Sequence, residues 1–166
     1  MLRIRGMLVV GLALLVAACG WQLRGAGGGG FEGVPVAIEG TFDNRFRARL
    51  AERLRDLDAV VVTDPTDAQV VIDVMSVSSR RRTVTTDADG FASEYELRYR
   101  IRFGLEAGGQ AGPEQATIAR QSVRTSASFA AESSNLQGRD AEEESLRRDL
   151  QEDALQLLLS RIGRRL

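Results

Sequence analysis

The chain has 166 residues, of which 22 are basic and 23 acidic, with a single cysteine and no histidine. The lack of histidine removes the commonest general base, the Ser-His-Asp and Cys-His arrangements and the usual zinc ligands. The near-neutral charge gives no indication of nucleic-acid binding, although every basic residue is arginine, which grips phosphate bidentately. We therefore expect no catalytic residues, no cofactor and no metal, and we do not expect an enzyme.

The first 18 residues have the three parts of a secretory signal. Two arginines form a basic start, residues 7–16 are an apolar run, and Ala17-Ala18 is a small-residue cleavage site. A transmembrane helix needs about 20 apolar residues. The run here is shorter, and polar, glycine-rich sequence follows it. We therefore expect residues 1–18 to be a leader and the mature chain to lie outside the cytoplasm.

The only cysteine, Cys19, follows this cleavage site directly. Residues 16–19, Val-Ala-Ala-Cys, resemble the bacterial lipobox, in which the cysteine thiol is acylated and the chain is cut just before it. The alternative is an ordinary cut at the same bond, which leaves a free thiol. Such a thiol is unusual in an oxidising compartment, so the sequence favours lipidation of Cys19. Gly20 stands where inner-membrane retention favours aspartate, and the pattern thus resembles an outer-membrane address.

Removal of the leader leaves 148 residues, a length typical of one domain. Five glycines and an alanine at positions 25–30 predict a flexible tether. We expect residues 19–33 to form the lipidated N-terminus and this tether, and residues 34–166 to form a single domain.

The first part of that domain predicts two short strands with a helix between them. Apolar residues alternate over 34–38, and β-branched residues occupy 60–63. Between them, Asp43 or Asn44 caps a helix. Its predicted apolar stripe consists of Phe46, Leu50, Leu54 and Leu57. Arginines cover the opposite side of this helix, either as a solvated face or as a surface for an anionic lipid or partner.

Long antiparallel strands are predicted next. Residues 69–86 are rich in β-branched and hydroxyl side chains, and 87–90 form a turn. From Phe91 to Glu106 two faces alternate almost without a break. The predicted apolar face holds Phe91, Tyr95, Leu97, Tyr99, Ile101, Phe103 and Leu105, and the charged face holds Glu94, Glu96, Arg98, Arg100, Arg102 and Glu106. Usual strands have about five or six residues, so we expect a long hairpin that reaches past the core.

The chain then predicts one more strand, a loop and a final helix. The strand covers 115–129, with a bulge near Arg120 because Ile118 is out of phase. Residues 130–139 read as a polar loop, and Asp140 with Glu143 forms a capping box for the helix. Its predicted stripe consists of Leu146, Leu150, Ala154, Leu157 and Ile162.

This order of elements predicts an α+β fold. Two helices pack on one face of a mainly antiparallel sheet of four to five strands with a long hairpin. The other face carries the alternating glutamates and arginines of the long strand. It is either a solvated face or a surface for a partner.

With the anchor and the order of elements in hand, the chain resembles the LptE family, small lipoproteins of lipopolysaccharide assembly. The matching residues are 19–21 (Cys-Gly-Trp), 23–24 (Leu-Arg) and 93–95 (Ser-Glu-Tyr). The resemblance implies a lipid-anchored protein on the periplasmic side of the outer membrane. It implies further that the domain plugs the barrel of the translocon LptD, assists its assembly and binds lipopolysaccharide. An accessory lipoprotein of another envelope lipid transporter and an envelope enzyme are the alternatives.

The resemblance also implies two basic lipopolysaccharide contacts, one near a hairpin tip and one in the loop before the last helix. Arg139 matches the second by its position. The tip departs from the pattern because residues 87–90 are acidic, but three arginines lie upstream of it. They form either a cluster of forks for lipid A phosphates or a solvated charge run. The predicted lipopolysaccharide-binding residues are Arg80, Arg81, Arg82 and Arg139.

Overall fold

The computed structural model describes residues 30–112, 117–131 and 136–166. The predicted leader, Cys19 and most of the tether lie outside these residues. The elements are β1 (Pro35–Glu39), α2 (Asn44–Arg55), β2 (Val60–Val62), the 3-10 helix η1 (Pro65–Asp67), β3 (Val70–Thr86), β4 (Ala92–Ala107), β5 (Ile118–Ala130) and α3 (Leu136–Gly163).

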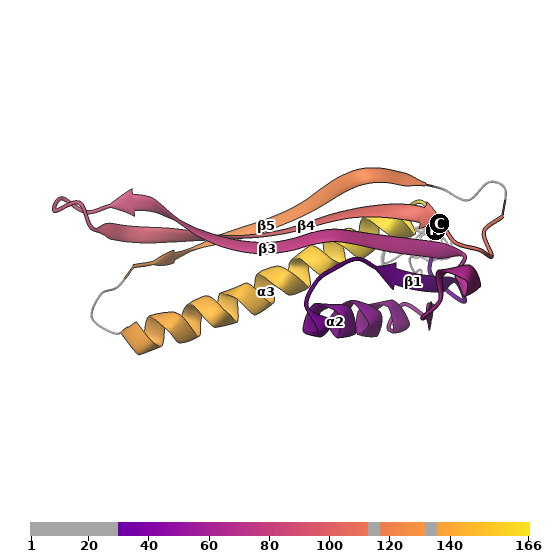
Figure 1. Ribbon diagram of the computed structural model, residues 1–166. Helices are drawn as coiled ribbons and strands as arrows, with labels where there is room; N and C mark the ends of the chain where they lie inside the picture. Colours follow the sequence, from indigo (N-terminus) through magenta and orange to yellow (C-terminus); the bar gives the residue numbers. More distant parts are fainter. Residues whose placement is uncertain (1–29, 113–116, 132–135) are drawn as a thin grey trace, which may run out of the picture.

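The five strands form one sheet in the order β2-β1-β3-β4-β5. Strand β1 runs parallel to both of its neighbours, whereas β3, β4 and β5 form an antiparallel meander. Parallel neighbours need a crossover connection, and α2 provides it between β1 and β2. Both helices lie on the same side of the sheet (Figure 1). The predicted α+β fold is therefore confirmed, with five strands and a long hairpin.

Helix α2 follows most of its predicted pattern, but it ends at Arg55, so the predicted stripe residue Leu57 lies past the helix and is only half-buried. The carboxylate of Asp43 accepts a hydrogen bond from the backbone N–H of Arg45 at 2.6 Å and so caps the helix. The guanidinium of Arg47, in the first half of the helix, donates hydrogen bonds to the carbonyl oxygens of Ile38 and Gly40 at 2.5 and 3.1 Å. This arginine therefore ties the helix to the end of β1. The buried residues of the helix are Phe46, Leu50, Ala51 and Leu54.

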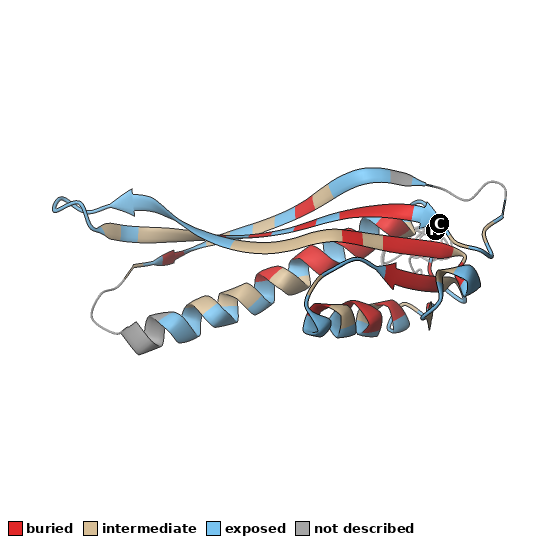
Figure 2. Cartoon of the chain, in the orientation of Figure 1, coloured by how far each residue is buried: buried red, intermediate tan, exposed pale blue. Residues whose placement is uncertain are grey.

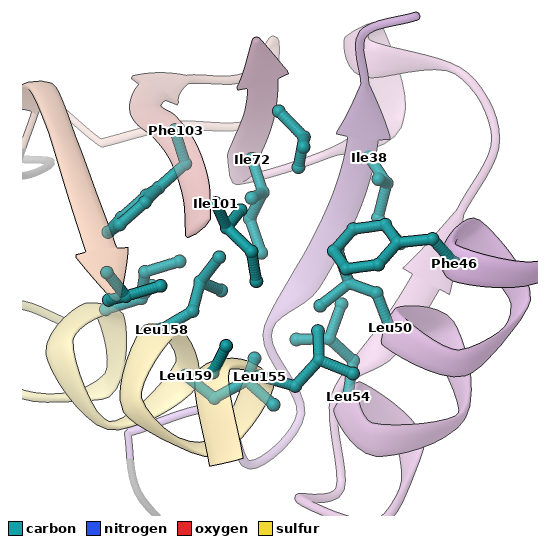
Figure 3. Close-up of a cluster of buried hydrophobic side chains, with 14 of the residues drawn as sticks. Ile38, Phe46, Leu50, Leu54, Ile72, Ile101, Phe103, Leu155, Leu158 and Leu159 are labelled. Carbon is teal, nitrogen blue, oxygen red and sulfur yellow. The ribbon is translucent and has the colours of Figure 1, made fainter. Parts of the chain in front are cut away.

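The core fills the space between the two helices and one end of the sheet (Figures 2 and 3). Phe31, upstream of the predicted domain start at residue 34, is fully buried in it. Arg53 of α2 pairs with Glu152 of α3 at 2.6 Å across the rim of this core. Large core side chains include Leu50 and Leu54 from α2, Leu155 and Leu158 from α3, and Ile72, Ile101 and Phe103 from the sheet.

The hairpin of β3 and β4 extends beyond this core, as predicted. The first residues of β3 are buried, but every residue from Arg80 to its end is exposed (Figure 2). Within β4 the predicted apolar face is confirmed, since Leu97, Tyr99 and Ile101 are all buried. Burial raises the pKa of Tyr99 to about 12.

The prediction is wrong for Phe91, which is 71% exposed beside the hairpin turn. No helix of the described residues extends to this end of the hairpin (Figure 1), which leaves the ring largely exposed.

The predicted bulge in β5 is also confirmed. Phe103 pairs with Gln121, but two residues further along β4, Leu105 pairs with Ile118. Strand β5 therefore carries one more residue than β4 over this interval, which places the bulge beside Arg120.

Helix α3 departs from the prediction at its start. It begins at Leu136, about one turn before the predicted cap Asp140, so the capping box is wrong and Arg139 lies within the first turn of the helix. Among the described residues, no helix is long and apolar enough to cross a membrane.

The buried stripe of α3 is wrong at one position. Leu157 is 43% exposed, whereas Leu158, one residue further, is fully buried. Successive residues are turned by about 100° around a helix axis, so these two side chains point in different directions. The buried residues of the stripe are Leu150, Ala154, Leu155, Leu158, Leu159 and Ile162.

Candidate functional site

The hairpin is joined to α3 by one charged network on the helix side of the sheet. The guanidinium of Arg81 lies 4.8 Å from the ring centroid of Tyr95 and pairs with Glu143 at 2.6 Å. Glu143 also pairs with Arg147 at 2.7 Å, and its side chain is only 14% exposed. Charge-assisted contacts to a largely covered carboxylate are stronger than open surface pairs. This network therefore holds β3 against α3.

A small hollow of about 260 Å³ lies beside this network. Three carboxylates and two guanidiniums line it, so its charge is unfavourable for an anionic ligand. The side chain of Arg139, which was predicted to bind lipopolysaccharide in this part of the chain, lies outside the described residues. The lining residues are Arg81, Asp140, Glu143, Glu144 and Arg147.

The three consecutive arginines of β3 do not form one cluster. Successive side chains of a strand point to opposite faces of the sheet. In the register of β3 and β4, Arg81 lies opposite Leu97 on the helix side of the sheet. Arg80 lies opposite Arg98. Arg80 and Arg82 therefore share the opposite side of the meander, which we call the open face. The structure thus separates Arg81 from its two neighbours.

On the open face, one carboxylate is held between two arginines. Arg82 and Arg98 each pair with Glu96 at 2.5 Å, and the Glu96 side chain is 16% exposed. The hydrogen bond from Arg82, followed by that from Arg98, holds the pKa of Glu96 below its usual value, although partial burial acts in the opposite direction. Glu96 therefore remains ionised at neutral pH and marks one end of a positively charged stretch.

Beyond Glu96, the charges in the middle of the open face are all positive. Arg100 of β4 lies directly opposite Arg124 of β5, as Arg80 lies opposite Arg98. A hollow of about 320 Å³ lies among Arg98, Arg100 and Arg124. We call this set the arginine ladder, which consists of Arg80, Arg98, Arg100, Arg102 and Arg124.

Sequence reasoning identified only part of this ladder. The alternation in β4 placed its three arginines on one face, but nothing local indicated which residues of β3 and β5 lie beside them. Arg124 was not among the predicted binding residues. Within the described ranges, no three His, Cys, Asp or Glu residues are grouped so that they could hold a metal ion.

Comparison with known families shows where the chain belongs. The family model for lipopolysaccharide assembly, LptE, matches residues 31–162. The chain belongs to the LptE family. This is a family of envelope lipoproteins accessory to lipopolysaccharide transport and not a known enzyme family. A search of curated proteins finds no match.

Solved structures share the fold of this LptE-family chain. The solution NMR structure of an uncharacterised lipoprotein B from Nitrosomonas europaea is 23% identical, with a TM-score of 0.71, and the match covers 87% of this chain and 90% of that one. The rare lipoprotein B from Shewanella oneidensis is 18% identical, with a TM-score of 0.65 and coverage of 78% and 93%. A minor lipoprotein from Acinetobacter baumannii is 18% identical, with a TM-score of 0.61 and coverage of 78% and 90%.

Proposed function

We propose that this chain is an outer-membrane lipoprotein, anchored on the periplasmic side through Cys19. It plugs an LptD-type barrel translocon, assists the assembly of that barrel and binds lipopolysaccharide during insertion into the outer leaflet. The observation that carries this proposal is the match of the LptE family model to residues 31–162. The resemblance of the residues around Cys19 to a lipobox supports the anchor.

The shape of the domain supports a role as a plug. The sheet is elongated, and the tip of the hairpin extends past the ends of both helices (Figure 1). One side of the meander is covered by α3, whereas the open face carries arginines and serines. The interior of large outer-membrane barrels is polar, and some are filled by another domain. A long domain with one polar sheet face suits such an interior.

Co-purification tests the partner directly. We expect the tagged, detergent-solubilised chain to bring down a large outer-membrane barrel in about equal amount, identified by mass spectrometry. A cytoplasmic-facing transporter or other envelope lipid carrier in stoichiometric amount, without a barrel, would contradict the proposal. Recovery of the chain alone from mild detergent would likewise argue against a stable plug.

The anchor has its own test. Cys19→Ala is expected to abolish labelling with radioactive fatty acid, because the acyl acceptor is removed. Gly20→Ala, which leaves the cysteine in place, is the matched control and is expected to remain labelled. Acyl labelling is the decisive measurement, since a chain held by its barrel stays with membranes even without lipid. Fatty acid on the Cys19→Ala variant would rule out this anchor.

Direct lipid contact by Arg80, Arg81, Arg82 and Arg139 remains part of the proposal. Their positions differ, however, because Arg80 and Arg82 lie on the open face and Arg81 is paired with Glu143. Arg80 and Arg82 therefore belong to a different surface from Arg81, and the two surfaces can be tested separately.

A further inference from the structure

We propose that the arginine ladder of the open face binds the phosphate groups of a lipopolysaccharide headgroup. This inference rests on the proposed lipopolysaccharide binding and gives it a location. It extends the predicted contacts, of which Arg80 belongs to the ladder, to Arg98, Arg100, Arg102 and Arg124 in the middle of the sheet.

The first argument is the arrangement of like charges. The register sets Arg80 opposite Arg98 and Arg100 opposite Arg124. Like charges directly opposite one another destabilise a sheet. In the described part of the chain, no hydrogen bond or ion pair engages the side chains of Arg80, Arg100, Arg102 or Arg124. The compensating charge for these arginines is therefore expected from a ligand.

The second argument is the space between these arginines. Arg98, Arg100 and Arg124 border the hollow of about 320 Å³, together with Ser126. Two or more guanidinium forks around one hollow match the oxygen geometry of phosphate groups. Small hydroxyl residues flank the ladder and add further donors without filling the space. By register these are Ser76, Ser78, Ser122 and Ser126.

The third argument separates a phosphate ligand from a protein partner. The cores of protein interfaces are enriched in aromatic and large apolar side chains. The middle of the open face carries arginine and serine instead. The other charged hollow, beside Glu143, is lined by more carboxylates than guanidiniums and repels an anion. The ladder is therefore the better site for a compact polyanion, such as a phosphorylated sugar headgroup.

The test compares three double variants of the full, detergent-solubilised chain. Arg100→Gln with Arg124→Gln removes one cross-strand pair of the ladder. Arg45→Gln with Arg55→Gln removes the same charge from exposed positions of α2 and is the matched control. Arg81→Gln with Arg139→Gln tests the other predicted surface. Each is titrated with purified lipopolysaccharide and with lipopolysaccharide stripped of its phosphates.

We expect the ladder variant to bind lipopolysaccharide about tenfold more weakly, and the α2 control to bind like wild type. Wild type should bind the dephosphorylated lipid weakly, and its affinity should fall more steeply with salt than that of the ladder variant. The urea midpoint of the ladder variant should be equal to or above that of wild type, because a like-charge pair has been removed.

Other results overturn the inference in distinguishable ways. Wild-type affinity of the ladder variant, or a loss confined to Arg81→Gln with Arg139→Gln, would move the lipid site elsewhere and leave the proposed function standing. Loss of barrel co-purification with unchanged lipid affinity would make the ladder a protein contact. If wild type itself does not bind lipopolysaccharide, the lipid-binding half of the proposed function fails together with the ladder.

Discussion

Replacement of Phe103 by alanine is expected to lower the free energy of unfolding by about 3 to 5 kcal/mol. Phe103 is fully buried on β4, and its ring lies in the core together with Ile101 and Leu158 (Figure 3). Truncation of the ring leaves a cavity between the helices and the sheet, because the surrounding elements relax only partly into the vacated space. Urea unfolding followed by circular dichroism measures the loss.

Phe91→Ala is the matched control for this substitution. Phe91 has the same side chain but is 71% exposed beside the hairpin turn. We therefore expect its truncation to change the free energy of unfolding by no more than about 0.5 kcal/mol. A cost at Phe91 comparable to that at Phe103 would mean that the tip is buried in solution, and a negligible cost at Phe103 would contradict the assigned faces of β4.

Gly40→Ala is expected to destabilise the chain by at least about 3 kcal/mol. Gly40 follows β1 and adopts a φ of +117°, a conformation that side chains with a Cβ rarely take. A Cβ at this position would also lie 2.1 Å from the carbonyl oxygen of Val74 in β3. Backbone that belongs to a central strand cannot move away cheaply, so both costs apply together.

Gly33→Ala separates these two costs. Gly33 also has a positive φ, of +69°, but nothing lies within 4 Å of its Cβ position. Its substitution is expected to cost only about 1 to 2 kcal/mol, from the backbone conformation alone. The difference between the two urea-derived values then gives the cost of the contact with Val74 together with the extra backbone strain of φ +117° over φ +69°. Equal values would show that β3 yields at this point.

The sequence was sufficient to predict buried faces and helix caps where the pattern that decides them is local. Side chains two apart on a strand share a face whatever the rest of the chain does, so the alternation from Tyr95 to Leu105 predicted the buried face of β4 correctly. The same holds for Phe46, Leu50 and Leu54 in the stripe of α2 and for its cap Asp43, although Leu57 lies past the end of the helix. These features depend on backbone geometry within a few residues.

The same reasoning failed where a local pattern allowed two answers. Residues before Asp140 have helical potential as well as polar character, and α3 extends through them to Leu136. Phe91 continues the alternation of β4, yet it lies past the end of the covering helices. Periodicity reports which side chains share a face, but it does not report how far the opposing element extends.

The candidate site shows most clearly which features follow from the local sequence and which depend on long-range packing. The sequence by itself determined that Arg98, Arg100 and Arg102 share one strand face, but Arg80, Arg81 and Arg82 were grouped as one cluster, which the structure divides between two faces. Only the tertiary structure decided that Arg124 lies opposite Arg100 and that Arg81 pairs with Glu143, 62 residues away. Pairing between strands and against a helix depends on long-range register and packing, since a shift of one residue would send every side chain to the other face.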